Sequence, residues 1–164
     1  MLLTGAYPRT LDEKHRLAIP KILRDAMDHP QSAVMYVAPG TDGSLALYTE
    51  EAFSRLADQL AQASPTGQEV RAFSRLFYAQ AQPVEMDRQG RVRIPTELVQ
   101  LAGLDKEVVL LGVRDHLELW SAHRWQEYLA EKQPHYDEIA ERAFGGQSTS
   151  RVVGPPAGRP PQPR

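Results

Sequence analysis

The stretch PRTLDEKHRLAIP at residues 8–20 returns as PVEMDRQGRVRIP at residues 83–95. Proline, aspartate, arginine, isoleucine and proline recur at matching positions, and apolar residues match at two more. A duplicated pattern constrains the fold more than a single motif does, because both copies must fit one architecture. Each copy places an Asp-x-x-x-Arg pair directly before a short apolar segment. We call residues 12–16 the first box and residues 87–91 the second box.

The duplication continues after each box with the same order of elements. Four segments are rich in β-branched, leucine and aromatic residues and are bounded by turn-forming residues, which predicts strands. They are residues 34–38, 45–48, 107–113 and 117–120. Pro20 and Pro95 suit the first turn of a helix. We therefore expect short helices at residues 21–27 and 96–101.

Longer helices are expected after the last strand of each copy. Thr49 and Ser121 are predicted N-caps, because their hydroxyl groups can accept from free amides of the first turn. Apolar residues at helical spacing then follow Thr49 on both sides of residues 64–67, which predicts a helical hairpin. The second copy offers Trp125 and Tyr128. At this spacing, the aromatic side chains indicate a core or a subunit interface rather than a ligand pocket.

The elements together predict an α+β fold. A unit of about 70 residues built from short strands buries little apolar surface alone, so we expect the two copies to share one core. The first repeat with its helical hairpin is expected at residues 1–82, and the second with its C-terminal helices at residues 83–144. Residues 145–164 are rich in proline and poor in apolar side chains, which predicts a disordered tail.

The composition argues against several classes of protein. Cysteine is absent, which excludes disulfides and thiolate metal ligands. The five histidines lack metal-binding spacing, and no glycine-rich phosphate loop is present. The first residues lack a signal-peptide pattern, and no apolar run approaches the roughly 18 residues of a membrane span. We therefore expect a soluble cytoplasmic protein without metal, cofactor, membrane partner or enzymatic activity.

Charge is segregated along the chain although the net charge is only −2. Between residues 9 and 24, the basic residues are Arg9, Lys14, Arg16, Lys21 and Arg24, and the acidic ones are Asp12 and Glu13. Residues 105–141 are mainly acidic, which is typical of solvated helical faces. The basic surroundings of the first box favour contact with a polyanion.

The box itself supports two interpretations. An aspartate can accept amides of its own turn, and a guanidinium presents a planar fork that matches the O6/N7 edge of guanine or a pair of phosphate oxygens. Arg16 and Arg91 could therefore face DNA, or each Asp–Arg pair could only pin its own turn. Recurrence of the pair favours DNA, because a two-fold pseudo-dimer that reads a duplex needs matched donors.

Over roughly residues 1–144 the chain resembles the MraZ family of bacterial transcriptional regulators. The resemblance rests on the two boxes, the apolar-x-Ile-Pro pattern after each, and Leu47-Tyr48 and Leu119-Trp120 ahead of the capped helices. It implies two AbrB-like swapped-hairpin repeats that form a pseudo-symmetric, β-barrel-like core flanked by helices. It also implies a ring-like homo-oligomer, associated with the nucleoid, that binds short direct repeats in double-stranded DNA upstream of the division and cell-wall gene cluster.

The candidate DNA-binding residues lie in or beside the two boxes. They are Arg9, Asp12, Lys14, His15, Arg16, Asp87, Gly90, Arg91 and Arg93. Within this set, the resemblance implies Asp12, Lys14, Arg16, Asp87, Gly90 and Arg91. Because the surroundings of the first box are more basic, we expect Arg16 to contribute more to binding than Arg91.

One position departs from the family pattern. The first box usually has glycine before its arginine, and this chain has His15. If the glycine serves a positive φ, His15 is strained there, although histidine tolerates that region better than most residues. If the glycine serves close approach to DNA, His15 could add a contact. The rival interpretation of the whole chain is an antitoxin-like AbrB/MazE interaction module, which the paired boxes and the short tail disfavour.

Overall fold

The computed structural model describes residues 1–27, 33–64 and 66–145. The tail predicted at residues 145–164 therefore lies outside the described residues, apart from Gly145 at the end of the last helix. The chain divides into two compact units, Met1–Gln126 and Glu127–Arg164. Both boxes belong to the first unit.

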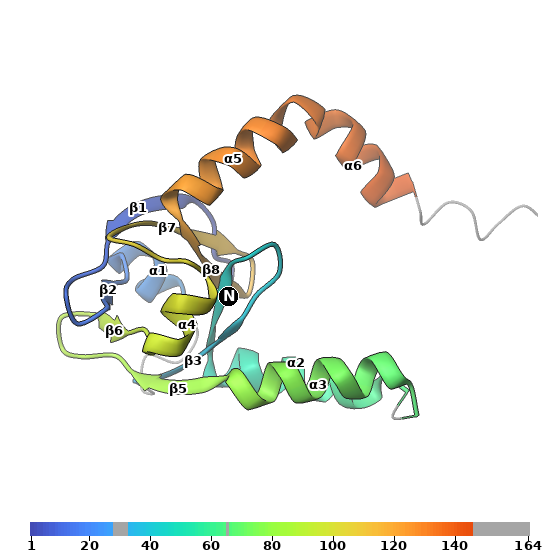
Figure 1. Cartoon of the computed structure of the whole chain (residues 1–164), viewed down its shortest axis with the longest axis horizontal. Helices are drawn as coiled ribbons and strands as arrows, with labels where there is room; N and C mark the ends of the chain where they lie inside the picture. Colours follow the sequence, from blue (N-terminus) through green and yellow to red (C-terminus); the bar gives the residue numbers. More distant parts are fainter. Residues whose placement is uncertain (28–32, 65, 146–164) are drawn as a thin grey trace, which may run out of the picture. The chain divides into compact units, whose positions relative to one another are not determined.

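The first unit contains an antiparallel sheet in which the two repeats interleave (Figure 1). In spatial order its strands are β1 (Ala6–Thr10), β7 (Glu107–Val113), β8 (His116–Ser121), β4 (Leu45–Thr49), β3 (Val34–Pro39) and β5 (Gln82–Glu85). Hairpins β3/β4 and β7/β8 lie within one repeat each. By contrast, β1 of the first repeat pairs with β7 of the second, β4 pairs with β8, and β5, which leads into the second box, pairs with β3. The sheet therefore needs both repeats.

Two further strands follow the boxes directly. β2 (Arg16–Ala18) and β6 (Arg91–Arg93) form a separate two-stranded antiparallel ribbon. The larger sheet ends at β1 and β5 and does not close on itself. The α+β class is confirmed, but the expected barrel-like core is not, because hydrogen bonding divides the described strands into an open sheet and this ribbon.

Apolar side chains from both repeats form one core, which confirms the expected shared packing. Leu17 and Leu47 of the first repeat and Val92 and Leu119 of the second are all fully buried in it. Each such side chain contributes about 1.5–3 kcal/mol when it leaves water. Much of that stabilisation depends on the other repeat, because both copies contribute strands to one sheet and side chains to one core.

Short helices follow the ribbon strands where prolines predict them. Pro20 precedes α1 (Lys21–Ala26), and Pro95 precedes α4 (Thr96–Leu101). Each helix buries an equivalent leucine, Leu23 or Leu98. The two helices thereby tie the ends of β2 and β6 to the core.

A helical hairpin separates the repeats, as expected. It consists of α2 (Glu50–Gln62), capped by the Thr49 hydroxyl that accepts from the Ala52 amide at 3.1 Å, and α3 (Gln68–Gln80). Phe53 of α2 stacks on Tyr36 of β3 with 4.4 Å between ring centroids, and on Phe77 of α3 at 5.9 Å. The predicted apolar stripe is only partly buried, since Phe73 remains 48% exposed.

Helix α5 (Ala122–Lys132) follows Ser121, whose hydroxyl accepts from the Arg124 amide at 3.4 Å. Arg124 Nη1 donates to the Gly43 carbonyl in the β3–β4 turn at 3.2 Å, which fixes the first turn of α5 to the other repeat. In the second unit, a 3₁₀ turn (Gln133–His135) contains Pro134, and α6 (Tyr136–Gly145) follows. Within the described ranges, no helix is long and apolar enough to cross a membrane.

Candidate nucleic-acid interface

Asp12 organises the first box through its own turn. Its Oδ1 accepts from the amides of Lys14 at 2.9 Å and Arg16 at 2.8 Å, and its Oδ2 accepts from Arg16 Nε at 2.5 Å. One carboxylate thus holds both the backbone of the turn and the side chain that leaves it. Such charge-assisted hydrogen bonds are shorter and stronger than neutral ones.

The second box repeats this geometry. Asp87 Oδ1 accepts from the amides of Gln89 at 2.9 Å and Arg91 at 3.0 Å, and Oδ2 accepts from Arg91 Nε at 2.9 Å. Each Asp–Arg pair therefore does pin its own turn. This does not exclude the other interpretation, because only Nε is engaged. The terminal guanidinium nitrogens have no hydrogen-bond partner among the described residues, and each arginine side chain is about one-third exposed.

The electrostatics of the two boxes match. The hydrogen bond from the Arg16 backbone amide holds the pKa of the Asp12 carboxyl below its ordinary value. The Arg91 amide has the same effect on the pKa of Asp87. Both aspartates are thus ionised at neutral pH and keep the two arginine side chains oriented.

The ribbon places the arginines on one face. In its register Arg16 lies opposite Arg93, Leu17 opposite Val92, and Ala18 opposite Arg91. Alternate residues of a strand point to opposite faces, and Leu17 and Val92 are fully buried. Arg16, Arg91 and Arg93 therefore share the outward face. We call β2 and β6 with these three side chains the arginine ribbon.

The repeats complete each other's turns. The Ile94 amide donates to the His15 carbonyl at 2.9 Å, and the Ile19 amide donates to the Gly90 carbonyl at 2.9 Å. His15 has φ 60° and Gly90 has φ 76°, so both boxes use the left-handed region at the same place. The strained conformation considered for His15 is the one it adopts, at a cost to a non-glycine residue of about 1–2 kcal/mol.

A contact at the second box was not predicted from the sequence. A Cβ at Gly90 would lie 2.6 Å from Nε and 2.7 Å from Cζ of Arg24 in α1, so this guanidinium covers the glycine. Arg24 Nε donates to the Ile19 carbonyl at 3.1 Å. Val99 in the second copy is the residue equivalent to Arg24, and His15 in the first copy is the residue equivalent to Gly90. The second box thus gains a cation from the first repeat, which adds to the charge that its own segment supplies.

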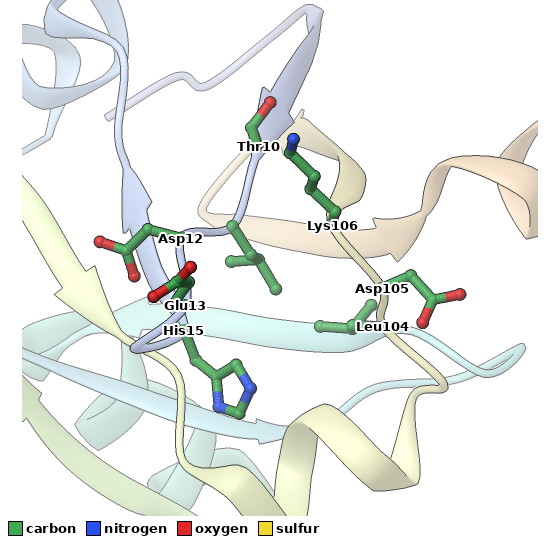
Figure 2. Close-up of a pocket in the computed structure, with 8 residues that line it drawn as sticks. Thr10, Asp12, Glu13, His15, Leu104, Asp105 and Lys106 are labelled. Atoms are coloured by element: carbon green, nitrogen blue, oxygen red, sulfur yellow. The ribbon is translucent and has the colours of Figure 1, made fainter.

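A hollow of about 600 Å³ lies beside the first box. Figure 2 shows the lining residues on two walls: Thr10, Asp12, Glu13 and His15 on one, and Leu104, Asp105 and Lys106 on the other. The walls are joined by a hydrogen bond from the Leu11 amide to the Lys106 carbonyl at 2.8 Å. Its charged lining includes Glu13 and Asp105, which makes it a poor site for an anion. The arginine ribbon is the better candidate for a surface that binds an anion.

The comparisons with known proteins agree with the duplicated boxes. A family model described as "MraZ protein, putative antitoxin-like" matches residues 2–76 and again residues 77–146. The chain belongs to the MraZ family. Each matched segment contains one box, so the internal duplication is also the duplication that defines the family match.

Curated MraZ relatives align over most of the chain. The protein named "Transcriptional regulator MraZ" from Mesoplasma florum is 35% identical over 146 residues, covering 89% of this chain and 98% of the relative. Relatives of the same name from Heliobacterium modesticaldum and Lactiplantibacillus plantarum are 35% and 38% identical and cover 86% and 84% of this chain, and 96% and 94% of their own lengths. The solution structure of PHS018 from Pyrococcus horikoshii covers 73% of this chain and 89% of its own, at 12% identity and a TM-score of 0.31.

Within this MraZ chain, the predicted site residues divide into two groups. Most lie on the ribbon or in the two turns that precede it: Asp12, Lys14, His15, Arg16, Asp87, Gly90, Arg91 and Arg93. Arg9 instead lies on β1 of the larger sheet, opposite Val108, with Nη1 donating to the Pro8 carbonyl at 3.0 Å. Contact of all these residues with DNA stays a prediction, and that for Arg9 has the least geometric support.

Proposed function

We propose that this MraZ-family chain is a transcriptional regulator that presents its arginine ribbon to double-stranded DNA. The observation that carries the proposal is a pair of aspartate-braced arginines, Arg16 and Arg91, on one exposed face. The names of the curated relatives support regulation of transcription. A solvated charged face without a partner would not need matched braces at equivalent positions in both repeats.

The proposed recognition follows from the donors that remain. With Nε held by an aspartate, each guanidinium keeps its two terminal nitrogens for O6 and N7 of a guanine or for two phosphate oxygens. The brace lowers the ordering cost of binding, because the side chain is oriented before DNA arrives. A lysine could not combine both contacts, since its single ammonium has no fork.

The proposed targets are short direct repeats upstream of the division and cell-wall gene cluster, as the family resemblance implies. Several subunits of a ring-like homo-oligomer would engage successive repeats, so that modest individual contacts add through effective concentration. Exposed apolar side chains on α3, Phe73 and Leu76, offer a surface for self-association. The corresponding localisation is the cytoplasm, in association with the nucleoid.

Fluorescence anisotropy with a labelled duplex from directly upstream of the protein's own gene tests DNA binding. Arg16→Ala should weaken binding by about 1–3 kcal/mol. Because Arg24 adds charge at the second box, Arg91→Ala should now cost a similar amount. Arg55→Ala on α2 removes the same charge away from the ribbon and is the matched control. Equal affinities for all three variants, with unchanged circular dichroism, would remove the ribbon from the interface.

Salt dependence and mass test the remaining parts. The logarithm of the binding constant should fall linearly with the logarithm of salt concentration, because phosphate neutralisation releases counterions. Light scattering should give a multiple of the 18.4 kDa chain. A monomeric mass at the concentrations used for binding would contradict the ring, and DNA binding would then have to be explained by one subunit.

A further inference from the structure

The two repeats differ on the face that carries the arginines. Leu17 and Val92 lie opposite each other at the centre of the ribbon, where the pseudo-two-fold axis passes. At one end Arg16 lies opposite Arg93, and at the other Ala18 lies opposite Arg91. Exact symmetry would require the same residue at positions 18 and 93. We call the Arg16/Arg93 end the paired end and the Ala18/Arg91 end the single end.

The paired end brings two like charges together. Side chains directly opposite on an antiparallel pair have Cβ atoms about 4.5–5.5 Å apart, and like charges in that position repel. Asp12 accepts from Arg16, but Arg93 forms no hydrogen bond or ion pair with any residue of the described ranges. An anion between the two guanidinium groups would remove the repulsion. A DNA phosphate has the charge and the oxygen atoms to do so.

The single end obtains its second cation in a different way. Arg24 comes from α1 and lies over Gly90, the residue before Arg91, with its Nε held by the Ile19 carbonyl. At the paired end the residue before Arg16 is His15, which has a side chain of its own, and the helix residue equivalent to Arg24 is Val99. The two ends thus differ in the strand cations and at the tip of the turn.

We infer that the arginine ribbon has two unequal ends and therefore a direction along the DNA. Arg93 completes a two-arginine phosphate site at the paired end, and each subunit binds duplex DNA in a single orientation. The inference rests on the proposed function, since it concerns how the same face meets DNA. A protein with a true two-fold axis matches palindromic sites, because both of its halves need the same contacts. A surface with unequal ends matches sites that all run in one direction.

A directed cleavage experiment reports orientation directly. The chain has no cysteine, so a single introduced cysteine can carry an iron chelate that cuts nearby DNA. Glu13→Cys marks the turn at the paired end and Gln89→Cys marks the turn at the single end, and both positions are exposed. The duplex is the segment directly upstream of the protein's own gene. We expect the two probes to cut on opposite sides of each bound site.

The outcomes distinguish a failure of the single orientation from a failure of DNA binding. Cleavage of both sides with equal strength by each probe, in a complex that anisotropy shows to be formed, would overturn the single orientation and leave DNA binding intact. Failure of the unsubstituted chain to bind the duplex at all would overturn the proposed function itself. Opposite sides for the two probes would support both.

A variant with the arginine moved to the other end tests whether Arg93 contributes to the choice of orientation. Arg93→Ala should weaken binding roughly 3- to 10-fold and lower the slope of the salt dependence by about one. The double variant Arg93→Ala/Ala18→Arg keeps the total charge but moves the arginine pair to the other end. Its ratio of cleavage on the two sides should shift towards the reverse orientation by a similar factor. An unchanged ratio, with circular dichroism as in the parent, would overturn the assignment of Arg93.

Discussion

Gly90→Ala should destabilise the fold through two separable effects. The residue has φ 76°, which costs a residue with a side chain about 1–2 kcal/mol. The new Cβ would lie 2.6 Å from Arg24 Nε, so Arg24 must move away and lose its 3.1 Å hydrogen bond to the Ile19 carbonyl. A hydrogen bond of this kind contributes about 1 kcal/mol. The expected loss in the free energy of unfolding is therefore about 2–3 kcal/mol.

A double-mutant cycle with Arg24→Ala separates the two effects. Without the Arg24 side chain, Gly90→Ala should cost only the backbone strain of about 1–2 kcal/mol, so the coupling should be about 1 kcal/mol. Urea unfolding of the four proteins gives these differences. His15→Ala is the matched control, because His15 already has a side chain at φ 60°, and it should change the free energy of unfolding by less than about 0.5 kcal/mol. An equal cost of Gly90→Ala in both backgrounds would refute the Arg24 contact.

Three further predictions concern the braces and the helical hairpin. Asp12→Asn keeps an acceptor for the amides but loses the ion pair with Arg16, so DNA affinity should fall several-fold in anisotropy titrations, and an unchanged affinity would exclude preorganisation by the brace. Because the pKa values of Asp12 and Asp87 are lowered, their stabilisation of the turns is complete above the ordinary value of 3.8 and is lost as pH falls below it. In an NMR titration, the amide resonances of Lys14 and Arg16 should therefore shift below pH 3.8. A titration midpoint above that value would contradict the lowered pKa. Phe53→Ala should lower the free energy of unfolding by about 2–4 kcal/mol, since it removes the aromatic stacking between the sheet and the helical hairpin. A loss below about 1 kcal/mol in urea unfolding would show that this stacking contributes little.

The local elements could be predicted because their signals are local. Turn-forming residues bound the strands, a proline stands before α1 and α4, and the Thr49 hydroxyl caps α2 as expected. The turn geometry of the boxes also followed from the sequence, since an aspartate that accepts amides two and four residues ahead acts within its own segment. These features need no knowledge of the other repeat.

The contacts between repeats could not be predicted in this way. Arg24 reaches Gly90 only because the strands interleave and bring α1 beside the second box, and no spacing along the chain indicates that. Likewise, the register that places Arg93 opposite Arg16 is a property of the β2/β6 pairing. Helical periodicity identified the apolar face of α3 but not what covers it, and Phe73 is half exposed. Whether the sheet closes into a barrel depends on how all the strands pair, and residue patterns do not specify that pairing.

The exchange of hydrogen bonds between the turns has a consequence for how this chain can evolve. The His15 carbonyl needs the Ile94 amide, and the Gly90 carbonyl needs the Ile19 amide, so neither turn is complete within its own repeat. In an assembly of identical single-box chains, each mutation would appear on both sides of the axis at once. Fusion of the two copies in one gene removes that restriction, because a substitution alters one turn and leaves its counterpart as it was. Positions 15 and 90 already differ, and selection can adjust one turn while the other keeps its own sequence.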